Sequence, residues 1–204
     1  MRCDRSRFNR TRINFHAVIE EIRKKISSLT ELAEQPYRII DSIPIPVCKF
    51  RRARFHKTFK GHGATYGKCP SKKETYLGYK LHMLTTLDGL VTDYVITPAN
   101  TDDRAAVWDL VDSYDNITML GDSNSKVQFP KSIRQLIFKL RRRIETTASQ
   151  LTQQLNIEQV LAKSFWGLQT RIKTKLLAYN LCYYINKLIG QDIEISRIKH
   201  LIFG

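Results

Sequence analysis

The sequence predicts an α/β fold in which helices cover both faces of a mixed β-sheet. Strand-like apolar runs occur at residues 37–43, 79–87, 90–97 and 117–122, and segments with helical spacing of apolar residues lie around them. Two of the strands form a hairpin, whereas the other two are separated by connections that can hold helices. This combination of a hairpin, single strands and helices is typical of a mixed sheet.

The N-terminal part of the chain is predicted to contain a basic arm, a helix and the first strand. Residues 1–13 are rich in arginine and poor in apolar side chains, which indicates an extended or loosely held arm. A helix is expected at residues 14–33, with one apolar stripe formed by Phe15, Val18, Ile19, Ile22, Ile26 and Leu29. The strand at residues 37–43 is expected to end at Pro44 and Pro46, because proline has no backbone N–H to donate.

Residues 49–73 form a basic segment that contains glycine, and we predict that it is a long loop. Basic and aromatic residues alternate here, and such segments can bind phosphates and stack on bases. We therefore expect DNA-contacting residues in this loop, namely Arg51, Arg52, Arg54 and Lys57. A zinc site is the weaker alternative, because its candidate ligands match no standard spacing: Cys48, His56, His62 and Cys69.

A β-hairpin follows, with its turn at Asp88 and Gly89. His82 lies in this hairpin, and a lone histidine on a strand is more often structural than catalytic. The remaining elements are a helix, a strand and two long helices, expected at residues 101–113, 117–122, 132–155 and 158–188. In the first of these helices Asp103 is expected to face solvent near the helix N-terminus.

Three carboxylates are the main candidates for chemistry in this basic chain. Asp41 lies within the first apolar strand and Asp122 ends the last one, where an ionised carboxylate is costly unless it is paired or bound to metal. If these strands are neighbours, the two carboxylates can meet at one edge of the sheet. With Glu145 from a helix, they can hold two Mg²⁺ or Mn²⁺ ions for phosphoryl transfer. Arg141 and Arg142 are candidate phosphate ligands beside Glu145, with a solvated helix face as the alternative.

The overall charge favours nucleic acid as a partner. The chain has 204 residues, with 34 Lys and Arg against 19 Asp and Glu, a formal net charge of +15 and 42% hydrophobic residues. That hydrophobic fraction suffices for the core of one domain, and the excess positive charge suits the phosphate backbone of DNA. Four scattered cysteines suit a reducing cytoplasm, and no segment reaches the length of a membrane span.

These residues and several shorter motifs resemble the DDE transposases of bacterial insertion sequences, in particular insertion-sequence family 982. The motifs lie at residues 6–10, 37–48, 78–82, 97–103, 120–122 and 143–145, and a Tyr-x-x-Arg-x-x-x-Glu pattern is met by Phe138, Arg141 and Glu145. The resemblance implies a ribonuclease H-like core in residues 14–190. It also implies that Asp41, Asp122 and Glu145 are the catalytic triad, which binds two Mg²⁺ or Mn²⁺ ions.

The same resemblance implies a partner and a location. The substrate would be double-stranded DNA at the ends of the element and at its target. A homo-oligomer is compatible with this family, as is a place in the bacterial cytoplasm, on the nucleoid when bound to DNA.

The chain departs from that family in two places. Transposases of this group carry a DNA-binding region ahead of residues 6–10, so a truncated N-terminus is expected. Only 22 residues separate Asp122 from Glu145, and Ser-Asn-Ser follows Asp122 where the family has Lys-Gly-Tyr and then a helix and a strand. We therefore expect an internal deletion near residues 122–130, an incomplete sheet, and a C-terminal tail at residues 191–204.

The sequence leaves two main functional hypotheses. The first is a transposase that cleaves and joins DNA strands by in-line phosphoryl transfer, in a copy whose deletion is expected to misplace the carboxylates and abolish activity. The second is a non-catalytic DNA-binding protein derived from a transposase, able to inhibit the full-length enzyme. A general ribonuclease H-like nuclease is a weaker third hypothesis.

Overall fold

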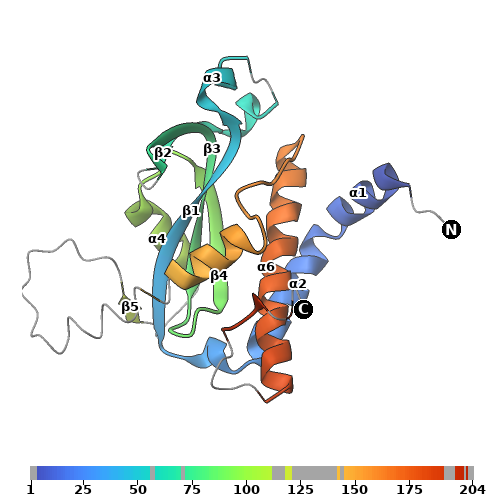
Figure 1. Cartoon of the computed structure of the whole chain (residues 1–204), viewed down its shortest axis with the longest axis vertical. Helices are drawn as coiled ribbons and strands as arrows, with labels where there is room; N and C mark the ends of the chain where they lie inside the picture. The colour runs from blue at the N-terminus through green and yellow to red at the C-terminus, as the bar shows by residue number, and fades with distance from the viewer. Residues whose placement is uncertain are drawn as a thin grey trace, which may run out of the picture.

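A computed structural model of the chain describes residues 4–55, 58–69, 72–111, 118–120, 142, 145–190, 196–199 and 201. The predicted α/β class is confirmed, because a five-stranded sheet lies against several helices (Figure 1). The strands are β1 (Tyr37–Lys49), β2 (Thr65–Cys69), β3 (Glu74–Thr85), β4 (Val91–Pro98) and β5 (Thr118–Leu120). The helices are α1 (Arg5–Asn14), α2 (His16–Leu29), α3 (Phe50–Ala53), α4 (Asp103–Val111) and α6 (Phe165–Leu188), and residues 145–153 are also helical. Single 3₁₀ turns occur at η1 (Leu32–Glu34) and η2 (Lys60–His62).

The sheet is mixed, as predicted, and β3 is its longest-paired strand. β3 runs antiparallel to β1 on one side and antiparallel to β2 and β4 on the other. β5 runs parallel to β1, with Ile39 opposite Leu120. The first and last strands of the sequence are therefore neighbours, which is the arrangement that the carboxylate hypothesis requires.

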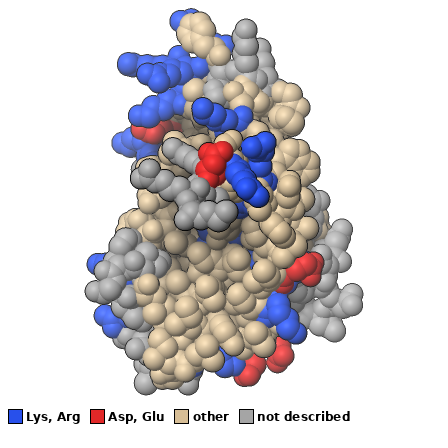
Figure 2. Space-filling model, turned by 90° about the vertical axis from the view of Figure 1, so that its right-hand side faces the viewer, with Lys and Arg blue, Asp and Glu red and all other residues tan. Residues whose placement is uncertain are grey.

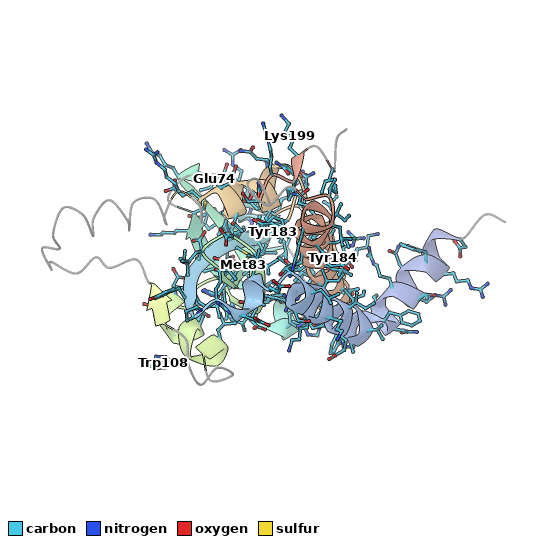
Figure 3. The ribbon with its side chains drawn as sticks, turned by 90° about the horizontal axis from the view of Figure 1, so that it is seen from below. Glu74, Met83, Trp108, Tyr183, Tyr184 and Lys199 are labelled. Carbon is cyan, nitrogen blue, oxygen red and sulfur yellow. The ribbon has the colours of Figure 1, made fainter. Side chains whose placement is uncertain are left out.

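Helices cover both faces of the sheet. On one face, apolar side chains of β1 and β3 pack against α6 and the helical residues 145–153, forming a core that includes Ile43, Leu81, Met83, Leu151, Ile172 and Tyr183. Met83 and Tyr183 lie between the sheet and α6 in Figure 3. On the other face, Asp103 of α4 contacts Lys80 and His82, which alternate with the core residues along β3.

The hairpin turn joins the sheet to the helices that pack on it. Gly89 has a φ of 95°, and a Cβ at this position would lie 2.5 Å from Thr147 Oγ1. Thr147 and Tyr179 each donate a hydrogen bond to the carbonyl oxygen of Gly89, at 3.2 Å in both cases. Tyr183 donates to the carbonyl oxygen of Asp88 at 3.1 Å. The predicted turn therefore has a second role, because it fixes the helical residues 145–153 against the sheet.

A buried arginine attaches α2 to the sheet. Arg23 is 0% exposed, and its guanidinium donates hydrogen bonds to the carbonyl oxygens of Val91 (3.0 Å) and Thr92 (2.8 Å) on β4. It also pairs with the carboxylate of Glu20 at 2.6 Å and lies over the ring of Tyr94. The apolar stripe predicted for this helix is not its most buried face, because four of its members are 45–51% exposed: Phe15, Val18, Ile22 and Leu29.

Two features of the N-terminal part differ from those predicted. Residues 5–13 of the basic arm are helical (α1) rather than extended, and the side chain of Asp4 accepts a hydrogen bond from the backbone N–H of Ser6 at the N-cap of this helix. β1 continues through Pro44 and Pro46 to Lys49. Within the described residues, β5 pairs with β1 only at residues 37–39, so one edge of β1 is open at both prolines. An open strand edge tolerates proline because no ladder hydrogen bond is lost there.

Two further boundaries differ from those predicted. The basic segment at residues 49–73 is not one loop, because it contains α3, η2 and β2. The last helix begins at Phe165 rather than near residue 158, since Ser164 caps it by accepting a hydrogen bond from Gly167 N at 3.1 Å. In the described part of the chain, none of the helices combines the length and hydropathy that a membrane crossing needs.

Replacing Arg23 by methionine is expected to destabilise the fold. The substitution removes the donors to Val91 and Thr92 and leaves the carboxylate of Glu20 without its partner. Breaking a buried ion pair in this way typically costs about 3–5 kcal/mol. Urea unfolding of Arg23→Met should therefore show a large loss of unfolding free energy. The matched control is Lys24→Met on the exposed side of the same helix, and equal effects of the two changes would contradict the anchoring role.

Candidate functional site

Asp41 lies on β1 in the middle of the sheet. It pairs in register with Met83 of β3, and its neighbours on the same strand face, Ile39 and Ile43, are each 2% exposed. The apolar and β-branched residues around it favour the extended strand. The backbone N–H of Ser42 donates a hydrogen bond to Asp41 Oδ1 at 2.8 Å. The predicted strand around Asp41 is therefore confirmed, and the Asp41 side chain is half-buried within it.

The surroundings of Asp41 disfavour its charge. The pKa of its carboxyl is raised from 3.8 to about 6, chiefly by burial and to a smaller extent by the negative charges of Asp103 and Glu145. The hydrogen bond from Ser42 acts in the opposite direction and is outweighed. Asp103 and Glu145, each on a helix, therefore lie within electrostatic reach of Asp41, and we call these three carboxylates the carboxylate cluster, the candidate site.

Glu145 reaches this cluster from the helical residues 145–153. Its side chain is exposed to solvent, whereas Thr147 and Leu151 on the same helix are 2% and 0% exposed. The contacts of Thr147 with Gly89 fix the position of this helix against the hairpin. The structure thus brings together two members of the predicted triad, Asp41 and Glu145, closely enough for the charge of one to affect the other.

Asp122, the remaining member of the predicted triad, lies outside the described residues. What the structure shows is the strand that precedes it. β5 ends at Leu120, which pairs with Ile39 of β1 in parallel register.

Asp103 is a site residue that the sequence prediction missed. It was expected to face solvent, and its side chain is indeed 58% exposed, but one oxygen also lies 3.0 Å from Lys80 Nζ and 3.4 Å from His82 Nδ1. The sequence signal for this role is the position of Asp103 in the first turn of α4, directly after the hairpin. That signal is incomplete, because residue spacing and charge pattern do not show that α4 folds back toward β1, the strand that holds Asp41.

His82 is structural in its contacts, as predicted. It is 0% exposed, and its Nε2 lies 2.9 Å from Thr97 Oγ1 on the paired strand β4. Burial lowers the pKa of its imidazole to about 4, so the ring is neutral at physiological pH. Because the His82 ring is neutral, Lys80 is the cation that pairs with the carboxylate of Asp103.

The predicted DNA-contacting residues lie apart from the carboxylates. Arg51 and Arg52 belong to α3, Arg54 follows it, and all three are exposed. Lys and Arg side chains gather toward the end of the molecule that carries α3, whereas the lower half of the same face is largely uncharged (Figure 2). Arg142 is exposed near Glu145, and the two other predicted contacts, Lys57 and Arg141, lie outside the described residues.

Carboxylate oxygens are the donors that Mg²⁺ and Mn²⁺ prefer, so the chemistry of Asp41 and Glu145 fits these ions. A cation would also relieve the repulsion that raises the pKa of Asp41. Among the residues that the structure describes, no three His, Cys, Asp or Glu side chains are close enough to form a complete metal site. This finding also gives no support to zinc at Cys48 and Cys69, while His56 lies outside the described residues.

Comparison with known protein families supports this interpretation of the carboxylates. Residues 33–124 match the family model of the transposase DDE domain, a range that includes Asp41, Asp103 and Asp122 and ends before Glu145. The match supports a relationship to DDE transposases. Searches of curated proteins and of solved structures give no match.

The pKa of Asp41 predicts how stability depends on pH. Because the folded protein binds this proton more tightly than the unfolded chain, the contribution of Asp41 to stability is greatest below pH 3.8 and is lost as pH rises through about 6. At pH 7.5, Asp41→Asn should therefore be more stable than wild type, by on the order of 2 kcal/mol.

Urea unfolding of both proteins between pH 4 and pH 7.5 measures this difference. The gap should close toward pH 4, where the Asp41 carboxyl is protonated in the folded protein. His82 contributes equally to both proteins and cancels in the comparison. A gap that does not change with pH would contradict the raised pKa.

Proposed function

We propose that this chain is a DNA-processing domain of the DDE transposase type, in which a carboxylate cluster binds divalent cations for strand cleavage and strand transfer. The observation that supports this most directly is the partial burial of Asp41 in β1, within reach of the charges of Glu145 and Asp103. The match of residues 33–124 to the transposase DDE domain supports it independently. The mixed sheet with helices on both faces is compatible with the ribonuclease H-like core that the resemblance implies.

Asp122 is the proposed partner of Asp41. It follows Leu120 by two residues, and Asp41 follows Ile39 by the same number. Since Ile39 and Leu120 are paired in parallel register, this equal spacing supports a common site for the two carboxylates. The site would be completed by Glu145 from the helix that the hairpin turn fixes.

In this proposal Asp41, Asp122 and Glu145 would hold two Mg²⁺ or Mn²⁺ ions. Such ions supply activation of the attacking oxygen and stabilisation of the leaving oxygen in phosphoryl transfer. A pKa of about 6 leaves Asp41 mostly ionised at pH 7.5 and therefore able to bind a cation. On the opposite face of the sheet, Lys80 lies 3.0 Å from Asp103 and would partly neutralise its charge.

The proposed DNA contacts are the arginines and lysines outside this cluster. Arg142 lies near Glu145, and Arg141 is its neighbour in sequence. The others belong to the segment around α3 and comprise Arg51, Arg52, Arg54 and Lys57. These side chains would neutralise backbone phosphates, which contribute affinity without sequence preference.

A second candidate function is favoured by the short connection between Asp122 and Glu145, which holds 22 residues. A misplacement of reacting groups by roughly 1 Å can cost about a hundredfold in rate. A chain in which a deletion shortens this connection would bind DNA and cations but cleave slowly or not at all. Such a protein could inhibit a complete transposase by occupying its DNA sites.

Cation binding tests the carboxylate cluster without requiring catalysis. Titration calorimetry with Mn²⁺ at pH 7.5 should show binding to the wild-type protein and at least tenfold weaker binding to Asp41→Asn. The control is Glu21→Gln, which removes an exposed carboxylate on α2 and should leave the affinity unchanged. Equal affinities of wild type and Asp41→Asn would exclude Asp41 as a ligand.

Nicking of supercoiled plasmid in Mn²⁺ distinguishes the two candidate functions. If the chain is catalytic, wild type should nick the plasmid and Asp41→Asn should not. If it only binds DNA, neither protein should nick, and both should bind the plasmid with the same strong salt dependence. Nicking that persists in Asp41→Asn would contradict the proposed active site.

A further inference from the structure

A groove lies beyond Asp41 along β1, toward the end of the molecule that carries α3 (Figure 1). It is enclosed by the end of β1, by α3 and by β2 and the beginning of β3, and has a volume of about 1150 Å³. Its lining begins at Pro44, three residues after Asp41 on β1, and continues to Lys49, which lies roughly 25 Å from Asp41 along the same extended strand. We call this feature the α3 groove.

The charge of the α3 groove suits a polyanion. Its lining includes four cations, Lys49, Arg51, Arg52 and Lys72, against two anions, Glu74 and Glu158. Lys72 and Glu158 form an ion pair with each other. The remaining lining is therefore dominated by the positive charges of β1 and α3, with Arg54 directly beside them.

Exposed aromatic rings accompany these cations. Phe50 and Phe55 line the groove and are 59% and 70% exposed, while Tyr66 of β2 is 50% exposed. The ring of Phe50 meets that of Tyr66 edge to face, with the centroids 5.7 Å apart. The guanidinium of Arg54 lies over the ring of Phe55 at 4.7 Å from its centroid. Flat apolar rings are thus held open to solvent within a basic surface.

The combination of cations and exposed aromatic rings favours an unpaired DNA strand over a duplex. A duplex presents phosphates to a protein, but its base faces are stacked on one another and cannot reach an aromatic ring. An unpaired strand presents both phosphates and free base faces, and stacking on aromatic side chains is a common mode of single-strand binding. The volume exceeds the range of about 300–1,000 Å³ that is typical of small-ligand pockets, which suits several nucleotides rather than one.

We propose that the α3 groove binds an unpaired stretch of DNA, with bases stacked on Phe50 and Phe55 and phosphates held by Arg51 and Arg52. This inference rests on the proposed function for DNA as the partner and adds a second, non-catalytic DNA site. A DNA strand separated from its complement at the carboxylate cluster would then be held at a distance from it.

Fluorescence anisotropy with matched probes tests the proposal on the full chain. The probes are a labelled (dT)₁₂ strand and a labelled 12-base-pair duplex at the same salt concentration. Phe50→Leu combined with Phe55→Leu should weaken binding of the single strand at least tenfold and change duplex binding less than twofold. Arg51→Gln combined with Arg52→Gln should weaken binding of both probes.

The matched control is Trp108→Leu, because Trp108 is 69% exposed on α4 and lies at the periphery of the molecule, away from the core residues (Figure 3). This change should leave both affinities as in wild type. A strand with 2-aminopurine in place of one base should lose fluorescence on binding to wild type and not to the double phenylalanine variant, which reports stacking directly.

Other outcomes separate this inference from the proposed function. If the phenylalanine variant binds both probes like wild type, or weakens both equally, the stacking site is refuted and the proposed function stands. Tighter binding of (rU)₁₂ than of (dT)₁₂ would refute DNA as the occupant. If the wild-type chain binds neither DNA probe at low salt, both the α3 groove assignment and the proposed DNA-processing function fail.

Discussion

The carboxylate of Asp41 is the constraint on which the candidate site depends. It lies half-buried on a strand between Ile39 and Ile43, and the charges of Asp103 and Glu145 act on it from two helices. A carboxylate in such a place lowers the stability of the protein near neutral pH unless a cation compensates it. The same unfavourable negative charge favours binding of a divalent cation. The loss of folding stability and the proposed cation binding therefore have the same cause.

The rest of the fold holds the members of this cluster in place. The carbonyl oxygen of Gly89 accepts hydrogen bonds from Thr147 and Tyr179, which positions the helical residues 145–153. Arg23 joins α2 to β4 through backbone carbonyl oxygens, and α6 packs over the core of the sheet. At the other end of β1, the basic and aromatic α3 groove provides a second surface, so one long strand connects the proposed catalytic and strand-binding regions.

Local patterns in the sequence were sufficient for part of this description. Asp-Gly between two β-rich runs predicts the hairpin, and an acidic residue among isoleucines predicts a buried carboxylate, because both signals depend on residues close in sequence. β1 runs through Pro44 and Pro46, where no strand of the described residues pairs with its outer edge, and Arg23 is buried because β4 offers carbonyl oxygens. Asp103 acts on Asp41 because α4 folds back on the sheet. These three features depend on tertiary contacts that no local pattern contains.

A ¹³C NMR titration of the Asp41 side-chain carboxyl is the most direct test of the central claim, with Asp41→Asn used to assign the signal. Without divalent cations the carboxyl should titrate near pH 6. In millimolar Mg²⁺ its midpoint should fall by at least one pH unit, because a bound cation favours the ionised form. A midpoint near the ordinary value of 3.8, unchanged by Mg²⁺, would contradict both the buried carboxylate cluster and its role in binding cations.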